Sequence, residues 1–156
     1  MKHIISVLVE NKFGVLARVS GLFSARGFNI DSLAVGVTED PTISRMTIVV
    51  KGDDKTLEQV KKQLNKLIDV ISVGDFANKE HIDRELLLIK VNIDKDAKKA
   101  VIDILEKAQA TIIKTADETV TAQIACDQDQ ISELFSSLNE YGIKEIVRTG
   151  RIAMAL

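Results

Sequence analysis

The sequence predicts an α+β protein in which the element order βαββαβ occurs twice. Three observations support this fold class. Short segments show apolar residues at every second position, the segments between them show apolar residues at helical spacing, and the whole pattern restarts after a polar stretch in mid-chain. A length of 156 residues allows two small domains. Because aromatic residues make up only 4% of a chain that is 46% hydrophobic, we expect aliphatic cores.

The first half is predicted to form one βαββαβ unit within about 76 residues. The first strand places Ile5, Val7 and Val9 on one face, and the two helices carry apolar stripes. A turn at Glu39–Pro41 follows from the fixed φ of proline. The expected strands are His3–Glu10, Asn29–Val37, Ser44–Lys51 and Val70–Phe76. The expected helix stripes are Val15, Leu16, Val19, Leu22 and Phe23 after Gly14, and Leu57, Val60, Leu64 and Leu67 after a cap at Asp53 or Asp54.

A polar segment, Ala77–His81, is predicted to link this unit to a second one of the same order. Its strands are expected at Leu86–Ile93, Thr111–Thr115, Thr119–Cys126 and Ile143–Met154. Its helices are expected at Asp96–Ala108 and around Ile131, Leu134, Phe135 and Leu138, where Gly142 ends the second helix. Each half is therefore a ferredoxin-like sandwich, with domains at residues 1–77 and 78–156.

Composition excludes several classes of function. A net charge of −2 disfavours non-specific binding to nucleic acid, which needs Lys and Arg to neutralise phosphates. The single cysteine, Cys126, cannot form an internal disulfide and favours a reducing compartment. The N-terminal apolar run is short for a signal peptide, and no apolar stretch approaches the ~20 residues that span a membrane. We expect a cytoplasmic protein that binds neither nucleic acid nor membrane.

Two glycines bracket the first helix and raise the possibility of a ligand site. The N-terminus of a helix attracts anions, and Gly14 lets a ligand approach that backbone closely. Asn11 and Asn29 offer amides that serve both a carboxylate and an ammonium. With the apolar Leu16 and Ile30, these residues describe a site for an aliphatic amino acid. The residues alone favour a simpler interpretation, with Gly14 as a turn glycine, Asn11 as a cap, and Gly27 as an ordinary helix end.

The second strand, "NIDSLAVGV", favours the ligand site. In this topology it lies at a sheet edge, and it contains neither lysine nor proline to protect that edge. Edge-to-edge pairing of two copies would form a homodimer and bring Asn29 and Ile30 of one chain towards the Asn11–Leu16 loop of the other. The sequence thus predicts an effector site at a dimer interface.

Several segments carry a resemblance to a known family. "ISVLVENKFGVLARVSGLFSARGFNIDSL", "SRMTIVVKGDDKTLEQVKKQLNKLIDV", "HIDRELLLIKV" and "IVRTGRIAMA" resemble the small regulatory subunits of acetolactate synthase, also called acetohydroxyacid synthase. The first half resembles an ACT domain, a family of amino-acid-sensing modules. Phe13 departs from the proline that many ACT domains have before the glycine.

This resemblance implies a non-catalytic protein of branched-chain amino acid biosynthesis. It would activate a catalytic large subunit, a transferase, and confer feedback inhibition by valine. It implies an effector site at Asn11, Gly14, Val15, Leu16, Asn29 and Ile30. Thiamine diphosphate, Mg²⁺ and FAD would belong to the catalytic partner, with no cofactor on this chain, and the second domain would contribute to activation.

Alternative functions on the same topology fit less well. RNA-recognition motifs stack bases on aromatic residues of the first and third strands, which here contain none. Metal chaperones of this fold need paired cysteines in the first loop, and "ENKFG" has none. No Walker loop, no GxSxG motif and no zinc spacing occurs, and neither His3 nor His81 has a catalytic neighbour in sequence. The remaining alternative is an ACT-type amino-acid sensor that regulates a different enzyme.

Overall fold

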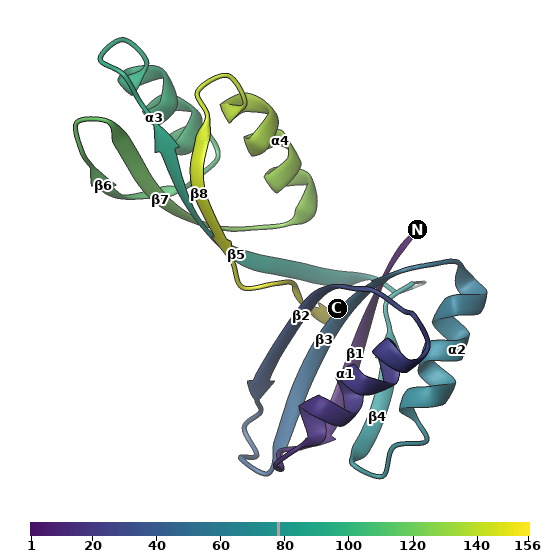
Figure 1. Cartoon of the computed structure of the whole chain (residues 1–156). Helices are drawn as coiled ribbons and strands as arrows, with labels where there is room; N and C mark the ends of the chain where they lie inside the picture. The colour runs from purple at the N-terminus through teal and green to yellow at the C-terminus, as the bar shows by residue number, and fades with distance from the viewer. Residues whose placement is uncertain (78) are drawn as a thin grey trace. The chain divides into compact units, whose positions relative to one another are not determined.

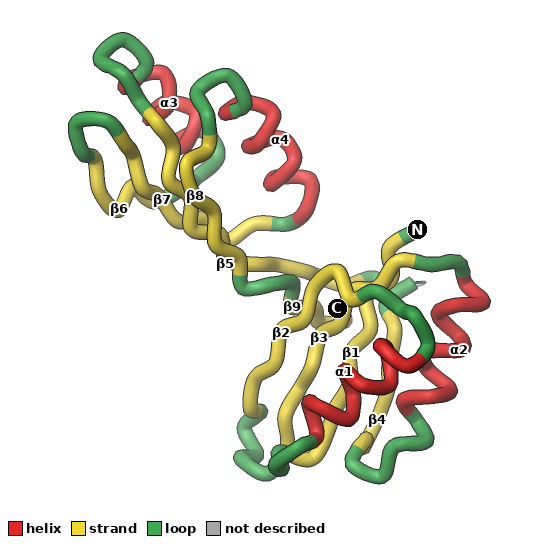
Figure 2. Tube along the Cα trace, in the orientation of Figure 1, coloured by secondary structure: helices red, strands yellow, loops and turns green. Residues whose placement is uncertain are grey.

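The computed structural model describes residues 1–77 and 79–156 (Figure 1). The chain divides into two compact units, which we call unit 1 (residues 1–83 and 151–156) and unit 2 (residues 84–150). Each unit is built around an antiparallel sheet with two helices on one face (Figure 2). The predicted fold class, α+β with βαββαβ twice, is confirmed.

Unit 1 contains the first βαββαβ set. Its elements are β1 (Lys2–Glu10), α1 (Val15–Ala25), β2 (Ile30–Val37), β3 (Ile43–Lys51), α2 (Asp54–Leu64) and β4 (Val70–Asp75). The strand order is β2-β3-β1-β4, so that β1 and β3 are central and β2 lies at an edge, as predicted. The register pairs Val7 of β1 with Met46 of β3.

The core of unit 1 is aliphatic, as the composition predicts. One face of β1 and β3 packs against the apolar stripes of α1 and α2, and these contacts remove the side chains from water. Val15, Val19, Leu22 and Phe23 of α1 are buried, whereas Leu16, which the sequence also placed on this stripe, is 46% exposed. The strand and α2 members of this core are Ile5, Val7, Val9, Met46, Ile48, Val50, Leu57, Val60 and Leu64.

Unit 2 repeats the arrangement with its own core. The elements of the second half are β5 (His81–Asn92), α3 (Lys98–Lys107), β6 (Thr111–Thr115), β7 (Thr119–Cys126), α4 (Gln128–Leu138), β8 (Ile143–Arg148) and β9 (Ile152–Ala155). The strand order is β6-β7-β5-β8, and β9 pairs with β5. Cys126 is fully buried in the unit 2 core, and burial raises the pKa of its thiol, as befits an unreactive core residue.

Two predictions about strands were wrong. The expected strand Leu86–Ile93 begins earlier, at His81, because its polar first residues continue the extended chain and β9 pairs with β5. The expected strand Ile143–Met154 breaks at Thr149–Gly150, where Gly150 adopts a positive φ of 81°. Residues 151–156 therefore group with unit 1, although the sequence assigned them to the second domain. Of the predicted linker Ala77–His81, Asn78 lies outside the described residues.

Aspartates cap two helix N-termini, and the cap at Asp53 matches the sequence prediction. The Asp53 side chain accepts a hydrogen bond from the backbone N–H of Thr56 at 2.8 Å. Asp127 and Gln130 form a capping box at α4, in which each side chain accepts a hydrogen bond from the other residue's backbone N–H. These bonds satisfy N–H groups that a helix leaves unpaired in its first turn.

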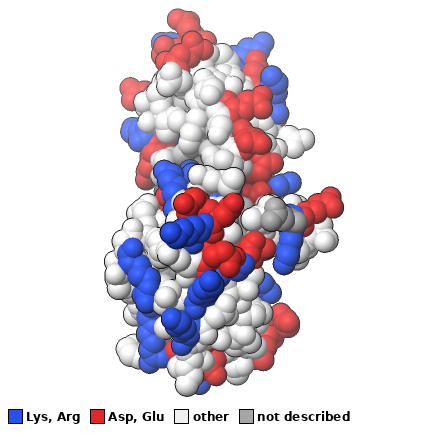
Figure 3. All heavy atoms as spheres, turned by 90° about the vertical axis from the view of Figure 1, so that its right-hand side faces the viewer, with Lys and Arg blue, Asp and Glu red and all other residues white. Residues whose placement is uncertain are grey.

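The surface carries charges of both signs. In Figure 3, acidic and basic side chains are interspersed over the face in view. Within the part of the chain that the structure describes, no helix is long and apolar enough to cross a membrane.

Candidate functional site

The loop between β1 and α1 exposes an uncapped helix N-terminus. Gly14 precedes α1 in the left-handed conformation, with φ at 83°, and no side chain caps the helix. Since L side chains rarely adopt this φ, the backbone itself favours glycine here. A Cβ built on Gly14 would meet no atom within 4 Å, so the space above this backbone is open.

The first N–H groups of α1 are available to a ligand. The first intrahelical bond runs from the N–H of Arg18 to the carbonyl of Gly14, at 3.0 Å. Before it, the N–H of Val15 makes only a long bond of 3.4 Å to Lys12, and within residues 1–77 and 79–156 the N–H groups of Leu16 and Ala17 have no partner. Unpaired donors and the positive end of the helix dipole together attract an anion such as a carboxylate.

Ion pairing and main-chain bonds hold the base of this loop in place. Arg18 of α1 forms an ion pair with Asp69, whose side chain is only 10% exposed. The backbone carbonyl of Asp69 in turn accepts a hydrogen bond from the N–H of Glu10, at 2.9 Å. The first turn of α1 is therefore tied to the end of β1 and to the turn before β4, so the helix N-terminus has a defined position.

Asn11 has a structural partner that its position in sequence did not indicate. Its side-chain Nδ2 donates to the carbonyl of Pro41 at 2.9 Å, and its backbone N–H donates to the carbonyl of Thr42 at 2.7 Å. These two bonds tie the β1–α1 loop to the β2–β3 turn. The side-chain amide group donates within the chain, which leaves the Oδ1 carbonyl to accept a hydrogen bond, for example from an ammonium.

The apolar residues of the loop divide between core and surface. Val15 is only 3% exposed and belongs to the unit 1 core, so its side chain does not line the predicted site. Leu16 is 46% exposed and is available to a ligand. Phe13, next to Gly14, is fully exposed. The sequence analysis noted Phe13 only because many ACT domains have proline at this position. In the sequence, the position of this aromatic residue between Lys12 and Gly14 in a loop could have indicated an exposed side chain that is available for a contact.

Asn29 and Ile30 lie at the opposite end of the sheet from this loop (Figure 1). Ile30 pairs with Val50, which also pairs with His3 at the beginning of β1, whereas the β1–α1 loop follows the end of β1. Over the 8 residues of β2, a rise of about 3.3 Å per residue separates the two ends by about 23 Å. A single chain therefore does not bring the predicted site residues together.

The start of β2 is held by charges and by the end of the chain. Asn29 Nδ2 donates to Asp31 Oδ1 at 3.0 Å, and Asp31 pairs with Lys2 and Lys51 at 3.4 and 3.7 Å. Burial acts to raise the pKa of Asp31, but the hydrogen bonds from Lys2 and Asn29 and the charges of Lys2 and Lys51 outweigh it and lower that pKa below its ordinary value. A register shift at Asp31 accommodates these contacts, and the N–H of Arg151 donates to Ser32 Oγ at 2.9 Å.

The described residues offer no metal-binding cluster. Within them, no group of three or more His, Cys, Asp or Glu side chains could hold a metal ion. His3 is buried in β1, with Nε2 3.1 Å from the carbonyl of Gly52, and His81 Nδ1 lies 2.8 Å from the carbonyl of Lys79. Both histidines lie in strands, His3 in β1 and His81 at the start of β5.

Comparisons with known proteins agree on one family across the chain. Residues 5–72 match the AHAS small subunit-like ACT domain family, and residues 84–156 match the family described as small subunit of acetolactate synthase. The acetolactate synthase small subunit of Mycobacterium bovis is 45% identical over 153 residues, which cover 98% of this chain and 91% of that protein. That of Aquifex aeolicus is 44% identical over 154 residues, covering 98% and 80%.

A solved structure shows the same fold along the whole length. The acetolactate synthase small subunit from Thermotoga maritima superposes with a TM-score of 0.89 at 39% identity, and covers 100% of this chain and 98% of that one. This likeness includes both βαββαβ units. The chain therefore belongs to the family of acetolactate synthase small subunits, with an ACT domain in its N-terminal half, and its role is that of a regulatory subunit for a catalytic large subunit.

Proposed function

We propose that this chain activates the catalytic subunit of acetolactate synthase and confers feedback inhibition by valine, which binds between the ACT domains of two copies. The observation that carries this proposal is the separation of the effector residues along β2. The Asn11–Leu16 loop lies near one end of this edge strand and Asn29 and Ile30 lie at the other. A site that uses both groups needs two chains.

Antiparallel pairing of two β2 edges supplies that arrangement. In such a pair across a two-fold axis, the start of one strand lies beside the end of the other. Asn29 and Ile30 of one copy then approach the β1–α1 loop of its partner, and the dimer contains two equivalent sites. The edge itself favours pairing, because Val35 and Val37 are exposed and Asp31 is its one charged residue.

The exposed flank of α1 supports a close approach of two copies. Ala17, Gly21 and Ala25 are exposed and recur every four residues, which places them on one face of the helix. A Cβ on Gly21 would meet nothing within 4 Å in this chain, although glycine inside a helix costs roughly 0.5–1 kcal/mol relative to alanine. A partner helix packed against this flank gives the small residues a function.

The chemistry of the site suits a branched aliphatic amino acid. The α1 N-terminus binds the carboxylate, a side-chain carbonyl such as Asn11 Oδ1 accepts from the ammonium, and Leu16 and Ile30 contact the side chain. Valine bound in this way touches both chains and stabilises one arrangement of the dimer. That preference passes to the catalytic subunit as a coupling free energy, typically ~1–3 kcal/mol.

The catalytic chemistry belongs to the partner. Thiamine diphosphate, Mg²⁺ and FAD are assigned to the large subunit, and the second half of this chain contributes to its activation. The test is acetolactate formation by the purified large subunit, measured alone, with this chain, and with this chain plus valine. We expect the chain to raise the rate and valine to reverse that increase. An unchanged rate, or an increase that valine does not affect, contradicts the corresponding part of the proposal.

A further inference from the structure

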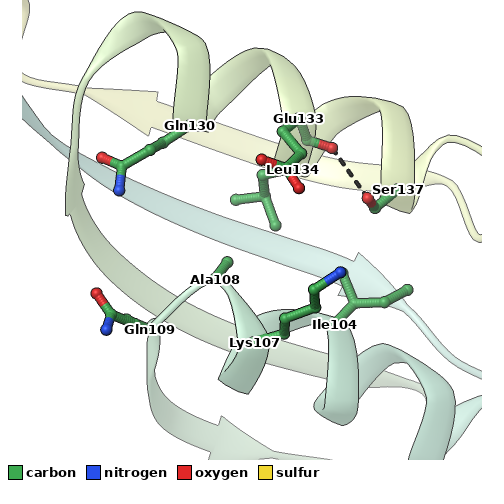
Figure 4. Close-up of a pocket in the computed structure, with 8 residues that line it drawn as sticks. All are labelled: Ile104, Lys107, Ala108, Gln109, Gln130, Glu133, Leu134 and Ser137. Atoms are coloured by element: carbon green, nitrogen blue, oxygen red, sulfur yellow. Dashed lines mark hydrogen bonds between the residues drawn. The ribbon is translucent and has the colours of Figure 1, made fainter.

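A pocket lies in unit 2, between α3 and α4, far in sequence from the effector loop. It has a volume of about 280 Å³. Drug-sized ligands occupy clefts of about 300–1,000 Å³, so this pocket suits a smaller molecule. The residues that line it are Ile104, Lys107, Ala108, Gln109, Gln130, Glu133, Leu134 and Ser137 (Figure 4). All of them belong to unit 2, so the pocket is complete within one unit of one chain.

Two solvent-exposed side chains of opposite charge border this pocket without pairing with each other. Lys107 extends from the last turn of α3 and Glu133 from the facing helix α4 (Figure 4). Among the described residues, neither side chain forms an ion pair or a hydrogen bond. Elsewhere in unit 2, Lys90 pairs with Glu145 at 2.6 Å. A ligand that carries both an anionic and a cationic group can satisfy the two pocket charges together.

Gln109 occupies a backbone position that glycine occupies after other helices. Its φ is 61°, and it is the one non-glycine residue with a positive φ in the part of the chain that the structure describes. Gly27 after α1 and Gly142 after α4 adopt the same left-handed conformation without a side chain. The Gln109 side chain is therefore present at a conformational cost, and such strain is typical of functional sites. Its carboxamide lines the pocket and has no partner among the described residues.

The remaining lining residues define the chemical class of the ligand. Gln130 Oε1 accepts from the backbone N–H of Asp127, which leaves the Nε2 donors of Gln130 available. Ser137 donates to the carbonyl of Glu133 at 3.0 Å, so its hydroxyl proton is already used (Figure 4). Ile104, Ala108 and the buried Leu134 supply an apolar surface. One lysine beside a carboxylate disfavours a phosphate, and a single carboxylate does not make a metal site.

We propose that the pocket between α3 and α4 binds a small zwitterionic α-amino acid, whose carboxylate contacts Lys107 and whose ammonium contacts Glu133. Its side chain lies against Leu134 and Ala108, and the carboxamide of Gln109 closes the site. This second amino-acid site goes beyond the valine site of the ACT domain and does not depend on it.

Backbone amide NMR of the full-length chain tests the proposal. The ¹⁵N-labelled protein is titrated separately with each of the twenty amino acids, and then with the N-acetyl and the amide derivatives of any that bind. We expect at least one amino acid to shift the amides of residues 107–110 and 130–137, in the wild type and in Gly14→Asp alike. Because each derivative lacks one of the two charges, we expect both to bind at least tenfold more weakly.

Charge-neutral variants assign the binding to this pocket. Lys107→Met and Glu133→Gln are expected to weaken binding at least tenfold, whereas Lys99→Met and Glu106→Gln, which make the same charge changes on α3 outside the pocket, are expected to leave it unchanged. Gln109→Gly is expected to raise Tm and to weaken amino-acid binding. If Gln109 had only a structural role, the substitution would change Tm and leave binding unchanged. The proposal is overturned if no amino acid shifts these amides, or if binding is the same in the Lys107 and Glu133 variants as in the controls.

Discussion

Replacement of Gly14 by aspartate separates effector binding from folding. A Cβ at residue 14 meets no atom within 4 Å, so the new carboxylate extends into the open space above the α1 N-terminus. There it takes the place of the valine carboxylate and repels it. At 4 Å the repulsion amounts to about 1 kcal/mol in water and about 4 kcal/mol at an effective dielectric constant of 20. With Leu16 46% exposed, the site lies between these limits. We therefore expect valine affinity to fall by roughly fivefold to several hundredfold.

The cost to folding is smaller and can be measured independently. A residue with a Cβ at a φ of 83° is strained by roughly 1–2 kcal/mol. An aspartate at a helix N-terminus returns about 0.3–1 kcal/mol through the helix dipole. Gly142→Asp is the control for strain, since Gly142 has a φ of 81° but lies in unit 2. Both variants should lose stability, and the loss should be smaller for Gly14→Asp because Gly142 follows a helix C-terminus.

The assay is acetolactate formation by the catalytic subunit, titrated with valine in the presence of each variant. Gly14→Asp should activate the enzyme and resist valine, and Gly142→Asp should retain valine sensitivity at any level of activation that it supports. Full valine sensitivity in Gly14→Asp would refute the reasoning and leave Gly14 as a turn residue only.

Three further predictions concern the edge, the effector and pH. Val35→Lys should shift the dimer towards monomer in sedimentation experiments, because the new charge would be buried against the partner's strand, and an unchanged dimer would exclude this edge as the interface. Valine should raise Tm, whereas aspartate and lysine should not, because their charged side chains would be desolvated beside Leu16 and Ile30. Equal stabilisation by all three amino acids would contradict an aliphatic site. Asp75 lies 2.7 Å from Lys61, whose hydrogen bond and charge lower the pKa of Asp75. The pair stabilises the fold at pH values above the ordinary carboxyl pKa, and this stabilisation is lost as the pH falls through the lowered pKa of Asp75. Asp75→Asn should therefore reduce the free energy of unfolding by up to about 1 kcal/mol at pH 7 and leave it unchanged in strong acid, as measured by denaturation at both pH values.

Most of the fold was predictable because periodicity and capping are local properties. The alternation in β1 and the stripe of α2 follow from which residues must avoid water, and Asp53 and Asp127 are recognisable caps at their positions. The break at Gly150 was not, because the run Ile143–Met154 gives no sign of the φ at one glycine within it. Nor did the run show that the chain's last residues would pair with the polar start of β5.

The open backbone of the β1–α1 loop was predictable, but the contacts of the residues around it were not. The positive φ of Gly14 and the absence of atoms near a Cβ built on it agree with a residue that leaves space, as the sequence predicted. Val15 could not be separated from Leu16, because adjacent helix residues differ by about 100° in direction and the sequence does not fix which one faces inward. The bond from Asn11 to Pro41 joins residues 30 positions apart, which local patterns do not reveal. The role of the six residues as one effector site stays a prediction, as does the cytoplasmic location.

The central claim is that each valine site is shared between two chains, and complementation between variants tests it most directly. Gly14→Asp damages the loop side of a site, and Asn29→Asp damages the strand side. In a shared site, a heterodimer of the two variants combines both lesions in one site and leaves the other site intact. Calorimetry on the purified heterodimer should therefore find one valine bound per dimer with wild-type affinity, although both homodimers bind valine more weakly than the wild type. If the heterodimer has no site of wild-type affinity while it remains a folded dimer, the site lies within a single chain and the account is contradicted.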